Sequence, residues 1–127
     1  MPWFQLAIAV LALIGSCVLQ VPAAMSQEEI GKTEFNSHCR NCHSTKKGDN
    51  RLGPTMYGIF NSRGGENPGY RNYSGGLTGL IWNEATLDRF IADPASVSPS
   101  TTMIFPPVGD AAVRKRIIAY LKTLNAP

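Results

Sequence analysis

Cys39-Arg40-Asn41-Cys42-His43 is the stretch of sequence around which the rest of the chain is interpreted. Two cysteines three positions apart lie on one helical turn, so both thiols can bond to one flat ligand beside the following imidazole. Cys-x-x-Cys-His is the attachment pattern of c-type haem. The run therefore predicts one haem c, covalently bound through Cys39 and Cys42, with His43 as an iron ligand.

Three other interpretations of the two cysteines are open. A dithiol redox motif would accompany a thioredoxin-like pattern of strands and helices, and the sequence shows no convincing strands. A zinc site needs four ligands, yet beyond this run the chain offers only His38 and Cys17. A disulfide between the two cysteines would close a very small loop and would leave His43 without a role.

Length and composition set further limits. The 127 residues suffice for a single domain with a modest core, which a buried macrocycle would help to fill. The net charge is only +3, and no block of five like charges occurs, so nucleic acid is not expected as a partner. His38 and His43 are the only histidines, which excludes a multihaem protein with paired histidine ligands.

The amino-terminal segment predicts export. Residues 3–21 are largely apolar and carry no charge, as in a secretory leader or a membrane span. We therefore divide the chain into a signal peptide or membrane anchor at residues 1–24 and a monohaem domain at residues 25–127, placed in the periplasm. Three fates of the leader stay open: cleavage after Ala23, retention as an anchor, or acylation of Cys17.

Helix signals frame the domain at both ends. Ser26 and Glu29 form a capping box that predicts a helix to about Cys39, and Gly31 within it indicates the close approach of another backbone. Asp110 is expected to cap the last helix. The apolar positions of that helix recur at helical spacing, namely Val113, Ile117, Tyr120, Leu121 and Leu124, and its basic residues are expected on the opposite face.

A middle helix and a proline-rich segment lie between them. Asn83 is a natural cap, flanked by Trp82 and Leu87 at the spacing of a hydrophobic staple, and the helix should end before Pro94. Residues 94–109 contain four prolines and are predicted to form a stiff strap. Met103 lies in its centre.

The second axial ligand can be argued by elimination. His38 directly precedes Cys39 and is confined to the side of His43. Met1 and Met25 fall in or beside the leader, and Met56 belongs to the loop expected beneath the haem. Met103 lies far enough along the chain to return on the opposite face, so it is the predicted thioether ligand.

The landmarks of residues 31–124 resemble, in order, those of class I cytochromes c of the mitochondrial and bacterial electron-carrier type. The resemblance implies an all-α fold in which crossed N- and C-terminal helices, shorter helices and loops surround one haem. The landmarks are Gly31, Phe35, the attachment run, Gly53-Pro54, Pro68-Gly69-Tyr70, Trp82, residues 100–105 and residues 118–122.

The resemblance also implies roles for single residues. The Pro54 carbonyl, which physical reasoning also offers as an acceptor for the histidine N–H, matches the family proline with that role. Trp82 and Tyr73 resemble the partners of the haem propionates, and Thr101 resembles the threonine near the inner propionate. By the same resemblance, His43 and Met103 are the axial ligands.

The implied function is that of a monomeric one-electron carrier, not an enzyme, in an exported respiratory or related chain. Its expected partners are membrane-bound electron donor and acceptor complexes, with residues 3–21 as a candidate membrane tether. Three departures bear on this: Phe90 replaces a family tyrosine, Arg63 is displaced from the usual arginine position, and Thr102 replaces a lysine. The alternative is a haem c subunit of a dehydrogenase or oxidase complex, or a weak peroxidase with a displaceable Met103.

Overall fold

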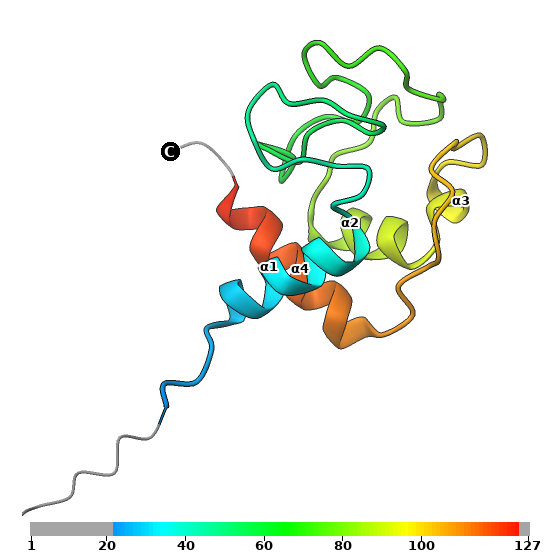
Figure 1. The fold of residues 1–127 in the computed structure, drawn as a ribbon. Helices are drawn as coiled ribbons and strands as arrows, with labels where there is room; N and C mark the ends of the chain where they lie inside the picture. The colour runs from blue at the N-terminus through cyan, green and yellow to red at the C-terminus, as the bar shows by residue number, and fades with distance from the viewer. Residues whose placement is uncertain (1–21, 125–127) are drawn as a thin grey trace, which may run out of the picture.

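The computed structural model describes residues 22–124, and the chain is helical within that range. Its helices are α1 (Gln27–His38), α2 (Glu84–Ala92), α3 (Pro94–Val97) and α4 (Ala111–Thr123). The described residues form no strand, and one isolated antiparallel bridge joins Arg63 to Ile81. Figure 1 shows α1 crossing α4, with the long loops between α1 and α2 gathered to one side of the crossing. The expected all-α fold is confirmed.

The predicted signal peptide or membrane anchor, residues 1–24, lies mostly outside this range. No helix within residues 22–124 combines the length and the apolar character needed to cross a bilayer. The predicted leader at residues 3–21 lies outside the described residues.

Helix α1 begins as its sequence predicts. The Ser26 hydroxyl accepts a hydrogen bond from the Glu29 amide at 3.2 Å, and the Ser26 amide donates to the Glu29 carboxylate at 2.9 Å. These reciprocal bonds satisfy two amides that a helix start would otherwise leave unpaired. The helix ends at His38, directly before the attachment cysteines. The capping box therefore fixes where the haem motif emerges from α1.

The crossing of α1 and α4 depends on a glycine. A Cβ placed on Gly31 would clash with the backbone carbonyl oxygen of Arg116 and would lie 3.0 Å from the Cβ of Tyr120. One turn later, the rings of Phe35 and Tyr120 pack with centroids 5.6 Å apart. Ile117 is fully buried in the same core. The predicted contact between the two terminal helices is thus confirmed.

Helix α2 has the predicted cap and ending, but the strap that follows differs from the prediction. The Asn83 side-chain oxygen accepts from the Thr86 amide at 2.9 Å, and Trp82 and Leu87 are both buried in the core. Residues 94–97 form the short helix α3, where the sequence suggested only a strap. Pro94 occupies the first turn of α3, where a missing amide and a fixed φ favour a helix start.

Helix α4 corrects the prediction of a simple basic face. Its Asp110 cap accepts from Ala112 at 2.8 Å, as expected. Arg114, however, is mostly buried and donates to the Asp88 carboxylate of α2 at 2.7 Å. Arg116 reaches Glu34 of α1 at 3.1 Å. These cations connect α4 to its neighbours, because the facing helices supply acidic partners.

Candidate haem site

A cavity of about 390 Å³ opens among the helices and the loops that surround them. Phe35, Leu87, Ile91, Ile117 and Leu121 bring apolar side chains of α1, α2 and α4 to its wall. The cavity brings together every site residue predicted from the sequence, namely Cys39, Cys42, His43, Pro54, Tyr73, Trp82, Thr101 and Met103.

The attachment run forms a tight turn after α1. The amides of Cys42 and His43 both donate to the Cys39 carbonyl, at 3.2 and 3.0 Å. Both cysteines are free thiols. Burial, together with the charge of nearby Cys42, raises the pKa of the Cys39 thiol to about 12. Cys39 is therefore a neutral thiol at the cavity wall, not an activated thiolate.

The His43 imidazole is held by one backbone acceptor. Its Nδ1 lies 2.7 Å from the carbonyl oxygen of Pro54, and the residue is 8% exposed. Because a carbonyl oxygen can only accept, Nδ1 carries the proton and Nε2 keeps its lone pair. Burial lowers the pKa of His43, and the bond to Pro54 opposes that effect in part. The site thus keeps a neutral imidazole, the form that binds a metal.

The loop that supplies Pro54 fits closely against the imidazole. A Cβ on Gly53 would lie 2.7 Å from Nδ1 of His43 and would clash with Cε1. The Gly53 amide donates to the Cys42 carbonyl at 2.8 Å. Any larger residue at this position would displace the ring or the loop, so glycine is needed for the bond to Pro54.

The methionines lining the cavity come from two segments. The backbone of Met56 is tied to the residue after His43, because its amide donates to the Ser44 carbonyl at 2.7 Å. Met103 belongs to a separate segment, where its amide donates to the Thr101 hydroxyl at 3.1 Å. Met25 is 57% exposed and does not line the cavity. Met56 and Met103 thus both line the cavity, and the choice of Met103 as ligand stays a prediction.

Known proteins resemble this chain in both sequence and structure. No family profile matches the chain. It is 40% identical over 97 residues to cytochrome c2 of Rhodopila globiformis, covering 75% of this chain and 91% of the relative. It is 36% identical over 98 residues to cytochrome c of Euglena viridis, covering 76% and 96%. Cytochrome cH from Methylobacterium extorquens aligns with a TM-score of 0.69 and 37% identity, covering 77% of this chain and 99% of that structure.

The chain belongs to the class I c-type cytochromes. Membership makes it a haem-containing electron carrier and implies a covalently bound haem c.

The residues of this cytochrome fit that group. Two free thiols, a buried neutral imidazole and a thioether share one largely apolar cavity, which is the donor set that a covalently attached haem requires. The other interpretations of the cysteines find less support. Within residues 22–124, no three or more His, Cys, Asp or Glu side chains are grouped to hold a metal ion. Nor does that range contain the strands of a thioredoxin-like fold.

Two of the residues predicted near the propionates, Tyr73 and Trp82, line both the main cavity and a second one. The Tyr73 hydroxyl accepts from the Asn67 amide at 3.1 Å, and burial raises its pKa. Trp82 is 7% exposed and packs edge-to-face on Phe90, with centroids 4.9 Å apart. Arg63 is exposed and lines a second cavity, of about 230 Å³, together with Tyr73 and Trp82. The cytochrome thus places Arg63 near this group but outside the main cavity.

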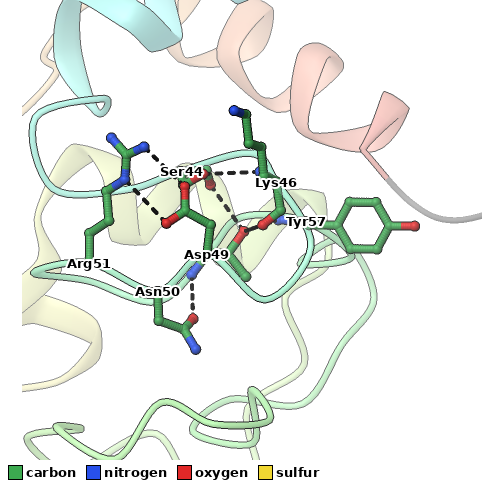
Figure 2. A network of polar contacts seen from close by, with 7 residues as sticks. Ser44, Lys46, Asp49, Asn50, Arg51 and Tyr57 are labelled. Carbon is green, nitrogen blue, oxygen red and sulfur yellow. Dashed lines mark hydrogen bonds and ion pairs between the residues drawn. The ribbon is translucent and has the colours of Figure 1, made fainter.

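A hydrogen-bond network that was not predicted from the sequence shapes the loop of residues 44–57, which follows His43. Figure 2 shows the polar contacts among residues of this loop, with the Tyr57 ring directed away from them. The Thr55 hydroxyl donates to the carbonyl oxygens of Lys46 and Ser44, at 2.7 and 3.2 Å, and Asn50 accepts from the Thr55 amide at 2.9 Å. The only sequence signal was a polar stretch of turn-forming residues. This network orients the neighbouring Pro54 toward His43.

An acidic residue completes the network at its surface. The Ser44 hydroxyl and then Arg51 hold the pKa of Asp49 below its usual value. Arg51 pairs with the carboxylate at 3.0 Å (Figure 2). The ionised Asp49 carboxylate therefore stabilises the turn at residues 46–51.

Proposed function

We propose that this cytochrome is a one-electron carrier of an exported respiratory or related electron-transfer chain. Its haem c would be attached through Cys39 and Cys42, with the iron bound by Nε2 of His43 and the sulfur of Met103. The observation that carries the proposal is the 2.7 Å bond between His43 and Pro54, in the same cavity as the two free thiols and Met103.

The fixed position of the His43 ring supports stable binding of the iron by this residue. Because Nδ1 of His43 is fixed by Pro54, the ring cannot rotate freely and Nε2 is presented in one orientation. A hydrogen bond at the outer ring nitrogen also makes the ligating nitrogen more basic. Gly53 lets the loop approach the ring closely enough for this bond to form.

The thioether side supports a carrier rather than an oxygen-binding protein. When bound, haem c supplies an iron that changes between the ferrous and ferric states. Thioether is a soft ligand that favours the ferrous state, and a buried apolar site acts in the same direction. With His43 and Met103 both holding the iron, oxygen or peroxide would find no free site on it.

The remaining site residues would hold the polar edge of the haem. Tyr73, Trp82 and Thr101 carry donors and line the cavity, so we assign them to the propionates. Burial of a propionate without such donors would be costly.

The export and partner assignments rest on sequence. We infer a signal peptide or membrane anchor at residues 1–24, a periplasmic location, a monomeric domain at residues 25–127, and donor and acceptor complexes as redox partners. An uncharged apolar leader supports export. Mass measurement of the purified native protein would report haem addition and cleavage or acylation of the leader together.

The test of ligation replaces Met103 by alanine in the haem-loaded protein. The oxidised wild type is expected to show a sulfur-to-iron charge-transfer band, and Met103→Ala should lose it. Met56→Ala is the matched control, because Met56 lines the same cavity from the side of His43. Retention of the band in Met103→Ala, or its loss in Met56→Ala, would contradict the assignment.

A further inference from the structure

Side-chain hydrogen bonds join the segment that carries Met103 to a loop distant in sequence. We call residues 98–107 the methionine segment and residues 70–79 the tyrosine loop. The Ser98 hydroxyl donates to the Gly75 carbonyl at 2.9 Å, and the Ser100 hydroxyl donates to the Ser74 carbonyl at 3.0 Å. A third bond also has its donor in the methionine segment, because the Thr102 amide donates to the Ser74 hydroxyl at 3.1 Å.

These bonds are the long-range polar attachments of the methionine segment. In the described part of the chain, the other hydrogen bonds of residues 98–107 are local, such as those from Thr101 to Ser98 and from Met103 to Thr101. The next backbone attachment to a distant element is from Val108 to Ile91. Prolines at positions 99, 106 and 107 have no amide to donate. The segment therefore depends on side-chain donors and acceptors to stay in place.

The buried member of the group shows that this attachment is part of the interior. Ser98 has 0% exposure, so its hydroxyl has no access to water. Removing that hydroxyl would leave the Gly75 carbonyl without its protein donor. Thr102 is exposed, whereas Ser74, its acceptor, is half-buried.

We propose that Ser74, Ser98 and Ser100 are positioning residues for the axial methionine. They hold Met103 at the cavity by bonding its segment to the tyrosine loop, and this role rests on the proposed ligation by Met103. An external ligand can take the iron position only after the methionine segment moves away. The serine bonds oppose that movement, so they determine how readily Met103 is displaced.

Imidazole binding to the oxidised, haem-loaded protein measures this directly. The oxidised state is chosen because ferric iron binds a thioether less strongly than ferrous iron does. Ser74→Ala and Ser98→Ala should each tighten imidazole binding by about five- to tenfold, the effect of losing one intramolecular hydrogen bond. Ser74→Thr keeps the hydroxyl and should restore the wild-type affinity. Hydrogen exchange at the Thr102 amide should become faster in Ser74→Ala.

Ser96→Ala is the matched control. The Ser96 hydroxyl donates to the Asp93 carbonyl at 2.7 Å, so this variant loses a serine bond from the same region that does not reach the tyrosine loop. Its imidazole affinity should equal that of the wild type. The proposal is overturned if Ser74→Ala binds imidazole no more tightly than Ser96→Ala does. If Ser98→Ala fails to fold, Ser74→Ala and Ser100→Ala decide the question in the same way.

These measurements distinguish a failure of ligation by Met103 from a failure of the positioning role of the serines. A wild type whose charge-transfer band does not depend on Met103 would refute the ligation itself. A wild type with that band, combined with unchanged imidazole affinity in all the serine variants, would leave the ligation intact and refute only the positioning role.

Discussion

Replacing Gly31 by alanine should weaken the crossing of the two terminal helices. The added Cβ would clash with the Arg116 carbonyl oxygen, which belongs to the backbone of α4. A flexible side chain could rotate away, but this carbonyl is fixed within its helix. The helices must therefore move apart to admit the methyl group, which also loosens the ring contact between Phe35 and Tyr120.

The expected loss of stability combines one stabilising effect with two destabilising ones. Alanine in place of glycine would stabilise α1 by about 1 kcal/mol through helix propensity alone. Overpacking of a well-filled core costs about 1–3 kcal/mol, and a rigid neighbour places this site at the upper end. Weakening the aromatic pair costs about 1 kcal/mol more. We expect a net loss of about 3 kcal/mol, or a melting temperature lowered by about 12–15 °C for a domain of this size.

Thermal unfolding of the haem-loaded protein, followed by far-ultraviolet circular dichroism, measures this loss. Gly109→Ala is the control, because a Cβ there meets no atom within 4 Å. That variant should be neutral or stabilised by less than about 1 kcal/mol, through the restricted unfolded chain. Equal melting temperatures for Gly31→Ala and the wild type would refute the close approach of α1 and α4.

Two further predictions concern charged side chains. Arg114→Ala should destabilise the protein by about 2 kcal/mol, because Arg114 donates to the Val108 and Gly109 carbonyls as well as to its acidic partner. Lys122→Ala, at an exposed ion pair, should lower the free energy of unfolding by less. Chemical denaturation of both variants measures the two losses. The pKa of Asp49 is lowered in the folded protein, so its stabilisation is present above its ordinary value of 3.8 and is lost as the pH falls through the folded value. Asp49→Asn should therefore show a smaller drop in denaturation midpoint between about pH 6 and pH 3 than the wild type does, and an unchanged drop would argue against the role of this carboxylate.

Local sequence signals predicted the helix boundaries well. The caps at Ser26, Asn83 and Asp110 each use a bond that spans two or three residues, so the pattern that encodes the bond is visible in the sequence. Helix α3 was missed because Pro94 is compatible with both a stiff extended strap and a first helical turn. The sequence alone does not distinguish these two outcomes.

Interactions across long separations were the part that the sequence could not supply. The charge pattern of α4 predicted basic residues on the face opposite its apolar positions, but it did not predict that Arg114 bonds to a carboxylate 26 positions earlier, on α2. Nothing in the local sequence of α4 identifies that partner, because it depends on how the helices pack.

In the candidate site, too, local patterns were visible in the sequence and long-range contacts were not. A family resemblance could assign Met103 because the order of landmarks carries that information. The serines that fix its segment are different, because Ser98 and Ser100 bond to residues 23 and 26 positions away through a loop with no regular structure. A serine in a polar, proline-rich stretch is ordinarily solvated, so only its zero exposure shows that Ser98 is a structural donor. The sequence thus supports a proposal for the ligand, whereas the hydrogen bonds that hold the methionine segment depend on the tertiary fold.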